Sequence, residues 1–235
     1  MYQGETVLVT GASRGLGRQL CEHFLAQGGD VIGISRAPAT LSHERYRHFE
    51  ADVGEEPAVR RVFSAIRAEQ RTVSVLINNA GVATSQFTLL MPTASADGML
   101  RTNFLGAFVV ARECGQLMVP HRYGRIINIS SVTVPLAPSG GAIYSASKAA
   151  LTQFTKVLAR ELAAYNITCN VLGVSAIETD MWNDLSKDRL QSMIDSLPLK
   201  RPATLADVAN VVDFFAHRAS GAITGQVVYL GGVSP

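Results

Sequence analysis

The chain has 235 residues, of which 47% are hydrophobic and 17% are charged, so it can bury a sizeable core and its composition argues against disorder. The formal net charge is only +2, and the basic residues form no run, which gives no support to nucleic-acid or membrane-surface binding. No apolar stretch approaches the roughly 20 residues of a membrane span, and no signal-peptide pattern precedes the first predicted strand. We therefore expect a cytoplasmic protein with no membrane or nucleic-acid partner.

Short β-branched runs alternate with helical patterns along the chain. Strands are predicted over residues 6–10, 31–35, 48–52, 73–78, 125–130, 168–172 and 227–230. Helices are predicted over residues 16–27, 56–69, 94–118, 144–165 and 205–217. This alternation indicates βαβ units, and the right-handed crossover rule then gives an α/β fold of Rossmann type: a doubly wound parallel sheet of about seven strands with helices on both faces. We expect one domain over residues 1–235, because no linker or repeat divides it.

A glycine-rich turn, T-G-A-S-R-G-L-G, joins the first predicted strand to the first predicted helix. Glycines permit positive φ and a close approach of the backbone, and free N–H groups at a helix N-terminus bind anions. The turn therefore predicts a dinucleotide phosphate site, although the same pattern also occurs in ordinary tight turns. Its candidate cofactor-binding residues are Gly11, Ser13, Arg14, Gly15, Leu16 and Gly17.

The glycine spacing resembles the signature of the short-chain dehydrogenase/reductase family, and the resemblance continues along nearly the whole chain. It implies that Asp52 and Val53 contact the adenine and that Asn79-Ala80-Gly81 braces the central sheet beside the cofactor. It also implies that Ile177 and Thr179 contact the nicotinamide carboxamide.

Charge at the end of the second strand indicates which cofactor is used. Many NAD-binding members of the family have an acidic residue there, but this chain has Arg36, and Arg14 lies within the glycine turn. Two guanidiniums would pair with a 2′-phosphate at about 1.5–3 kcal/mol per charge-assisted contact. Two solvated surface arginines are the alternative, but together the pair predicts NADPH (NADP+).

A Y-S-A-S-K pattern places Tyr144 and Lys148 on one face of a helix. A free tyrosine has a pKa of about 10, and a nearby ammonium lowers that pKa. The resemblance implies that Ser131 is the catalytic serine. Because side chains alternate along a strand, the Ser130 side chain should point to the other face of the sheet. The resemblance adds Asn103 as the fourth catalytic residue.

The family implies a role for each of these four residues. Tyr144 would protonate the alkoxide that develops from a ketone, and Ser131 would donate a hydrogen bond to the same oxygen. Lys148 would bind the nicotinamide ribose and tune Tyr144, and Asn103 would hold a proton-relaying water. No metal site is predicted, because Cys21, Cys114 and Cys169 are scattered singly along the chain.

One turn departs from the family pattern. Members usually have N-x-x-x-P-G after the sixth strand, but here Val174 and Ser175 occupy the Pro-Gly positions. Losing proline frees φ and losing glycine narrows the backbone options, so we expect a reshaped turn. The chain also reads Leu230-Gly231-Gly232 where D-G-G is common.

Within the family the chain most resembles bacterial 3-oxoacyl-[acyl-carrier-protein] reductases, through T-G-A-S-R-G-L-G, G-R-I-I-N-I-S-S, Y-S-A-S-K-A-A-L and I-E-T-D-M. The resemblance implies reduction of the 3-oxo group of an acyl thioester and contact of Arg122 with an acyl carrier protein. Residues 82–87 and 182–196 should border the substrate pocket. It further implies a homotetramer or homodimer built on the long helices around Asn103 and Tyr144.

Two alternatives to this function stay open. The chain could act on a free secondary alcohol, sugar or cyclic ketone, since the fold and the four catalytic residues are shared while pocket loops vary. It could also be a non-catalytic NADPH-binding sensor or scaffold, against which the intact catalytic residues speak.

Overall fold

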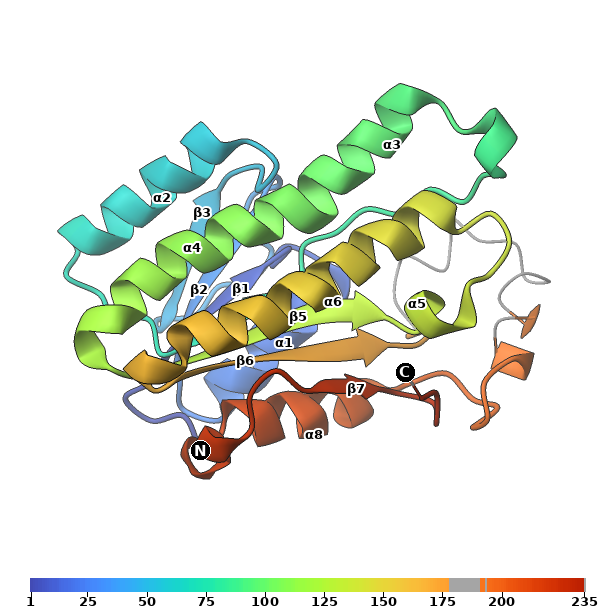
Figure 1. The fold of residues 1–235 in the computed structure, drawn as a ribbon. Helices are drawn as coiled ribbons and strands as arrows, with labels where there is room; N and C mark the ends of the chain where they lie inside the picture. The colour runs from blue at the N-terminus through green and yellow to red at the C-terminus, as the bar shows by residue number, and fades with distance from the viewer. Residues whose placement is uncertain (178–190, 193, 235) are drawn as a thin grey trace.

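Seven parallel strands form one sheet in the order β3-β2-β1-β4-β5-β6-β7 (Figure 1). The computed structural model describes residues 1–177, 191–192 and 194–234. The strands are β1 (Thr6–Thr10), β2 (Asp30–Ser35), β3 (Tyr46–Glu50), β4 (Val75–Asn78), β5 (Gly124–Ser131), β6 (Ile167–Val174) and β7 (Val227–Tyr229). The predicted Rossmann-type sheet is therefore confirmed. Among the described residues, no helix is both long enough and apolar enough to cross a membrane.

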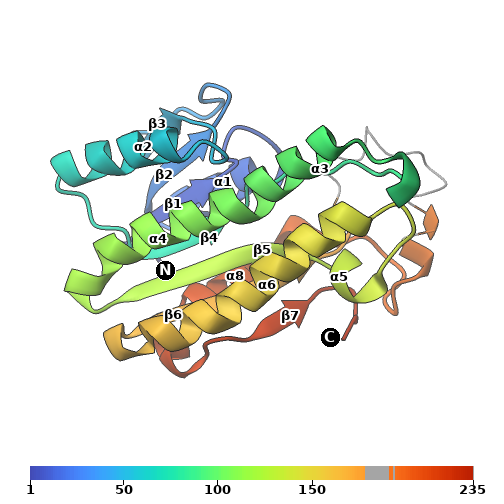
Figure 2. The same cartoon turned by 45° about the horizontal axis from the view of Figure 1, so that its top comes forward.

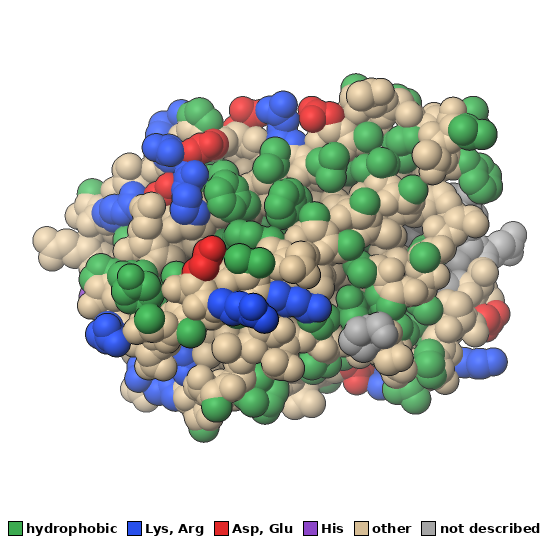
Figure 3. All heavy atoms as spheres, in the orientation of Figure 1, with side chains coloured by type: hydrophobic (Ala, Val, Ile, Leu, Met, Phe, Trp, Pro, Cys, Tyr) green, Lys and Arg blue, Asp and Glu red, His purple; other side chains and the backbone are tan. Residues whose placement is uncertain are grey.

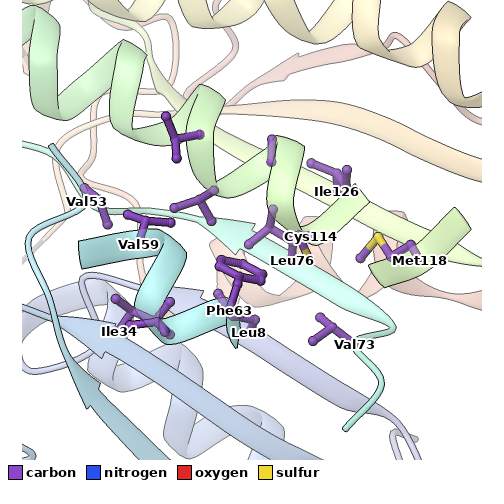
Figure 4. Packing of buried hydrophobic residues seen from close by; sticks show 14 of the residues in the cluster. Leu8, Ile34, Val53, Val59, Phe63, Val73, Leu76, Cys114, Met118 and Ile126 are labelled. Atoms are coloured by element: carbon purple, nitrogen blue, oxygen red, sulfur yellow. The ribbon is translucent and has the colours of Figure 1, made fainter. Parts of the chain in front are cut away.

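Helices cover both faces of the sheet (Figures 1 and 2). The first face carries α2 (Glu56–Ala68), α4 (Ala107–Met118) and α6 (Ala142–Leu162), and the opposite face carries α1 (Gly15–Ala26) and α8 (Leu205–Ala216). Each layer buries an apolar stripe against β-branched strand residues. Figure 4 shows the first core, in which Phe63 of α2 packs with Leu8 of β1 and Leu76 of β4.

Element boundaries differ from the predicted ones where the sequence signal is weak. Strand β3 begins and ends two residues before the predicted 48–52, because pairing with β2 and not its own alternation sets its register. The predicted helix 94–118 consists of α3 (Thr93–Leu100), a π-helix η2 (Arg101–Gly106) and α4. The short helix α5 (Thr133–Leu136) was not predicted. The 3-10 helices are η1 (Thr88–Leu90), η3 (Val119–His121), η4 (Ala163–Tyr165) and η6 (Arg218–Ala222).

A buried polar network ties the centre of the sheet to its covering helices. Asn78 Nδ2 of β4 donates to Asn128 Oδ1 of β5 at 2.9 Å and to the Ala107 carbonyl at 3.0 Å. Asn128 Nδ2 in turn donates to Thr155 Oγ1 of α6 at 2.8 Å. Because buried polar groups are costly when unpaired, this network fixes how α4 and α6 lie on β4 and β5.

Removing the central amide tests that network. We expect Asn128→Ala to lower the free energy of unfolding by about 2–4 kcal/mol, because Asn78 and Thr155 each lose a buried partner. Urea unfolding of the cofactor-free protein measures the change. The control Asn210→Ala, at an exposed position of α8, should stay within about 0.5 kcal/mol. Equal effects at the two positions would contradict the role assigned to the network.

Candidate active site

The sheet has its topological switch point between β1 and β4, where successive crossovers leave in opposite directions. Ligands of open α/β sheets bind at the carboxyl ends of the strands beside such a point. The glycine turn follows β1 there, and Asn79-Ala80-Gly81 follows β4. Ser131, the last residue of β5, lies at the same edge.

Glycines in the turn allow α1 to pack directly on the ends of β1 and β4. Gly11 and Gly15 have positive φ, at 72° and 53°. A Cβ at Gly17 would collide with the carbonyl oxygen of Gly11 and the side chain of Asn79. Helix α1 starts at Gly15, and no side chain of the described residues caps its first N–H groups. Those N–H groups are therefore free to bind an anion.

Asn79 connects the two strands on either side of the switch point. Its Nδ2 donates to the Thr10 carbonyl at 2.9 Å. The backbone N–H groups of Asn79 and Ala80 both donate to Thr10 Oγ1 at 3.0 Å. These bonds form the brace between β1 and β4 that the N-A-G motif leads one to expect.

The candidate residues for the adenosine end lie at the ends of β2 and β3. Arg36 Nη1 lies 4.0 Å from Asp52 Oδ2, and the Arg36 side chain is 63% exposed. Asp52 Oδ1 also accepts a hydrogen bond from the Gly54 N–H at 2.8 Å. Val53 is buried against Gly106, and Arg14 is exposed within the glycine turn. An uncapped helix N-terminus and a turn in which glycines allow close approach of the backbone fit the phosphates of a dinucleotide.

The structure brings Ser131, Tyr144 and Lys148 together. Ser131 is close enough to the hydroxyl of Tyr144 to affect its pKa, and Ser131 Oγ accepts from Thr133 Oγ1 at 3.0 Å. One turn along α6, Lys148 is 3% exposed, and its Nζ donates to the Ile129 carbonyl at 2.9 Å. That Nζ lies 6.0 Å from the centroid of the Tyr144 ring. The predicted serine, tyrosine and lysine thus form one cluster at the carboxyl edge.

Asn103 joins this cluster from the π-helix η2, a feature that is common at functional sites. Its side chain is fully buried, donates to the Val82 carbonyl at 2.9 Å and accepts from the Val82 N–H at 2.8 Å. It also donates to Ser147 Oγ at 3.0 Å. A Cβ at Gly81 would lie 3.3 Å from Asn103 Oδ1 and 3.4 Å from Lys148 Nζ. The loop after β4, η2 and α6 therefore meet at Gly81.

Burial determines the protonation of the cluster. It raises the pKa of Tyr144, and the hydrogen bond from Ser131 offsets this only in part. Burial also lowers the pKa of Lys148 to about 8. The expectation that Lys148 lowers the pKa of Tyr144 is thus not met in the protein alone, because desolvation dominates and the ammonium donates to Ile129. At neutral pH Tyr144 therefore carries a proton that it can donate.

Two serines beside the cluster have supporting positions. Ser130 Oγ lies 3.3 Å from the Lys148 carbonyl and 3.1 Å from Thr152 Oγ1, which agrees with the expected alternation along β5. Ser147 was not predicted: its Oγ donates to the Tyr144 carbonyl at 2.6 Å and accepts from Asn103. Ser147 lies three residues after Tyr144 on the same helix, and this spacing could have predicted that the two residues are neighbours.

The departures from the family pattern lie around the end of β6. The strand continues through Val174, and Ser175 is buried with no hydrogen-bond partner for its Oγ in the part of the chain that the structure describes. Ile177 pairs with Ala203. Thr179 lies outside the described residues, as does most of the predicted pocket border 182–196.

Arg122 is not part of the cluster. It precedes β5, whereas Ser131 ends that strand, so the two lie at opposite edges of the sheet. Its Nη2 donates to the Ala164 carbonyl at 2.9 Å, and the side chain is exposed.

Comparisons with known proteins agree with this geometry. A profile of the family described as short chain dehydrogenase matches residues 5–190. The chain is 34% identical to the 3-oxoacyl-[acyl-carrier-protein] reductase FabG of Escherichia coli, over 98% of this chain and 97% of that protein. It is also 34% identical to the 3-oxoacyl-[acyl-carrier-protein] reductase MabA of Mycobacterium tuberculosis, over 98% of this chain and 93% of that protein.

Solved structures with the same fold include sugar-related dehydrogenases. The ligand-free aldohexose dehydrogenase of Thermoplasma acidophilum matches with a TM-score of 0.89 and 28% identity, over 100% of this chain and 96% of that one. A putative gluconate dehydrogenase from Agrobacterium tumefaciens matches with a TM-score of 0.88 and 28% identity, over 98% and 95%.

The buried ammonium of Lys148 gives a pH-dependent prediction. Its pKa is lowered from 10.5 to about 8, so the unfolded chain binds more protons between these two pH values, and stability rises with pH across that window. We expect Lys148→Met to raise the free energy of unfolding below pH 8 by about 1–3 kcal/mol, and the gain to disappear above pH 10.5.

Urea unfolding of the cofactor-free protein at several pH values measures this difference. The control Lys156→Met removes an exposed lysine of the same helix and should leave the pH dependence unchanged. A Lys148→Met gain that is the same at every pH would show that Lys148 is not desolvated.

Proposed function

The chain belongs to the short-chain dehydrogenase family and is an oxidoreductase that uses NAD or NADP, and from that premise we propose that it is an NADPH-dependent reductase of ketones. The observation that carries the proposal is the meeting of Ser131, Tyr144 and Lys148 at the edge that holds the glycine turn. NADPH supplies the hydride when it is bound.

The side chains of the cluster supply the proton and the polar contacts of a carbonyl reduction. Tyr144 is protonated at neutral pH and donates to the oxygen that becomes the alcohol. Ser131 is beside the Tyr144 hydroxyl in the free protein, so a carbonyl oxygen placed between them would accept from both. Lys148 would bind the ribose hydroxyls, and Asn103 holds Val82 and Ser147 in place behind them.

A preference for NADPH is supported by charge at the adenosine end. Arg36 and Arg14 are both exposed there, and the end of β2 carries no carboxylate of its own. Asp52, the nearest carboxylate, lies 4.0 Å from Arg36, a distance at which an exposed ion pair is weak. A 2′-phosphate would bring a higher charge to the same guanidinium.

For the substrate, we propose the 3-oxo group of an acyl thioester. The two curated relatives are named as 3-oxoacyl-[acyl-carrier-protein] reductases. The loop after Gly81 also carries exposed apolar side chains, with Phe87 57%, Leu89 98% and Leu90 65% exposed. The Gln86 N–H donates to the Gly140 carbonyl, which ties this loop to the turn before α6. An apolar surface on the loop next to the start of α6 suits an acyl chain better than a sugar.

Reduction of a sugar or other free carbonyl is the second candidate. The names of the two structural neighbours support it, because one is an aldohexose dehydrogenase and the other a putative gluconate dehydrogenase. Arg122 remains a proposed contact for an acyl carrier protein, separate from the catalytic cluster.

A homotetramer or homodimer is part of the same proposal. An apolar groove of about 400 Å³ runs between α4 and α6, lined by residues that include Phe108, Phe154 and Leu162. Figure 3 shows hydrophobic side chains gathered over these helices. Among the apolar side chains of α6, Leu151 and Leu158 are buried in the protein itself, whereas Val157 is 46% exposed and available to a second copy.

Removing one hydroxyl tests the catalytic assignment. We expect Tyr144→Phe to lower kcat for NADPH oxidation with acetoacetyl-CoA by about 10²–10⁴-fold, because the proton donor is lost. The Kd for NADPH, measured by its fluorescence, should change less than about 2-fold. Tyr165→Phe, at an exposed position, is the matched control and should keep full activity. A Tyr144→Phe enzyme with near-normal kcat would refute the assignment.

A substrate panel separates the two candidate functions. The proposal predicts turnover of acetoacetyl thioesters with NADPH and little turnover with NADH. Activity on free ketones and aldoses alone would contradict the thioester substrate and favour the second candidate. With acetoacetyl on an acyl carrier protein, Arg122→Glu should raise KM by about 10-fold while KM for acetoacetyl-CoA stays unchanged. Equal KM values for Arg122→Glu and wild type on the carrier-bound substrate would remove Arg122 from the docking contact.

A further inference from the structure

The loop that follows β2 carries Arg36, and one carbonyl next to this residue is held by two side chains. Ser35 Oγ donates to the Ala37 carbonyl oxygen at 2.8 Å, and His48 Nε2 lies 3.0 Å from the same oxygen. A carbonyl oxygen only accepts hydrogen bonds, so His48 Nε2 carries the hydrogen, and it also lies 3.2 Å from Ser35 Oγ. The Ala37–Pro38 peptide, one residue beyond Arg36, is thereby held partly from the neighbouring strand.

Tyr46 fixes His48 in turn. Its hydroxyl lies 2.8 Å from His48 Nδ1, which has a free lone pair once Nε2 carries the hydrogen, so the hydroxyl donates. Burial raises the pKa of Tyr46, which keeps that hydroxyl protonated. Gly33 is the strand partner of His48, and a Cβ there would collide with the Tyr46 hydroxyl. Gly33 therefore leaves the space in which Tyr46 reaches His48.

A second contact ties the same loop to the glycine turn. Thr40 Oγ1 donates to the Ser13 carbonyl at 2.6 Å, next to Arg14. The loop is thus anchored at two points. One is Ala37, which follows Arg36, and the other is Thr40, which bonds to the residue before Arg14. These are the two arginines proposed for the 2′-phosphate. The Arg36 side chain itself is 63% exposed, and in the part of the chain that the structure describes its charged partner is Asp52 at 4.0 Å. The position of its backbone therefore decides where its guanidinium can reach.

We propose that His48 is a positioning residue for cofactor choice: through the Ala37 carbonyl it holds Arg36 where the guanidinium meets the 2′-phosphate of NADPH. The inference rests on the proposed use of NADPH. His48 does not touch the phosphate in this account, and its effect on binding passes through Arg36. NADH, which has no 2′-phosphate, should bind independently of His48.

The first test replaces His48 by residues that lose or keep the donor. We expect His48→Leu to raise the Kd for NADPH by about 3- to 10-fold, the value of one or two hydrogen bonds, with the Kd for NADH and kcat at saturating NADPH nearly unchanged. His48→Gln keeps a side-chain N–H donor and should restore most of the NADPH affinity. His121→Leu, on the exposed η3 at the other edge of the sheet, is the matched control and should change neither Kd.

A double-mutant cycle separates positioning from general damage. In the Arg36→Ala background, where the guanidinium is gone, His48→Leu should change the Kd for NADPH by less than about 2-fold. Additive losses in the two backgrounds would overturn the inference, as would an equal loss of NADH and NADPH affinity. If His48→Leu does not fold, Ser35→Ala removes the other donor to the Ala37 carbonyl and serves in the same cycle.

Failure of the inference is distinguishable from failure of the proposed function. A wild-type protein that binds NADPH no better than NADH would contradict the cofactor proposal and this inference with it. A wild-type preference for NADPH that survives in His48→Leu would contradict the inference alone.

Discussion

Helix α1 packs closely against the ends of β1 and β4 through Gly17, which has no side chain, and the binding edge depends on that contact. Gly17 lies against the Gly11 carbonyl and the Asn79 side chain, and Asn79 is itself bonded to Thr10. A Cβ at Gly11 or Gly17 would push these segments apart. The close approach aims the uncapped N-terminus of α1 at the point where the crossovers diverge, which is where an anion is best stabilised. The same contacts thus join β1 to β4 and position the N-terminus of α1 as a candidate phosphate site.

The catalytic cluster is assembled on the same edge by side chains that bond mainly to backbone. Asn103 links Val82 to Ser147, and Lys148 donates to the carbonyl of Ile129 near the end of β5. These bonds place the Tyr144 hydroxyl beside Ser131 in a desolvated site, where it keeps its proton at neutral pH. A protonated tyrosine suits reduction, in which the oxygen of the substrate gains a proton. Through its bonds to Val82 and Ser147, Asn103 connects the loop after β4 to α6.

Much of this could be predicted because local patterns and side-chain chemistry agree. Strand and helix periodicity identified all seven strands, and the glycine turn and the Y-S-A-S-K pattern located residues that the structure brings to one edge. The raised pKa of Tyr144 in the protein alone was not anticipated, because burial depends on tertiary packing that spacing along a helix does not reveal. The π-helix at Asn103 and the contacts of Ser147 and His48 escaped prediction for the same reason: each depends on residues from distant segments.

The central claim is that this edge passes a hydride to a ketone carbon while Tyr144 supplies the proton. The most direct measurement uses NADPH dideuterated at the nicotinamide carbon that donates hydride, acetoacetyl-CoA, and mass spectrometry of the hydroxyacyl product. The account predicts one deuterium at the carbon that was the ketone, and no label at that carbon when unlabelled NADPH is used in heavy water. A product without deuterium from NADPH, or with solvent deuterium at that carbon, would contradict it.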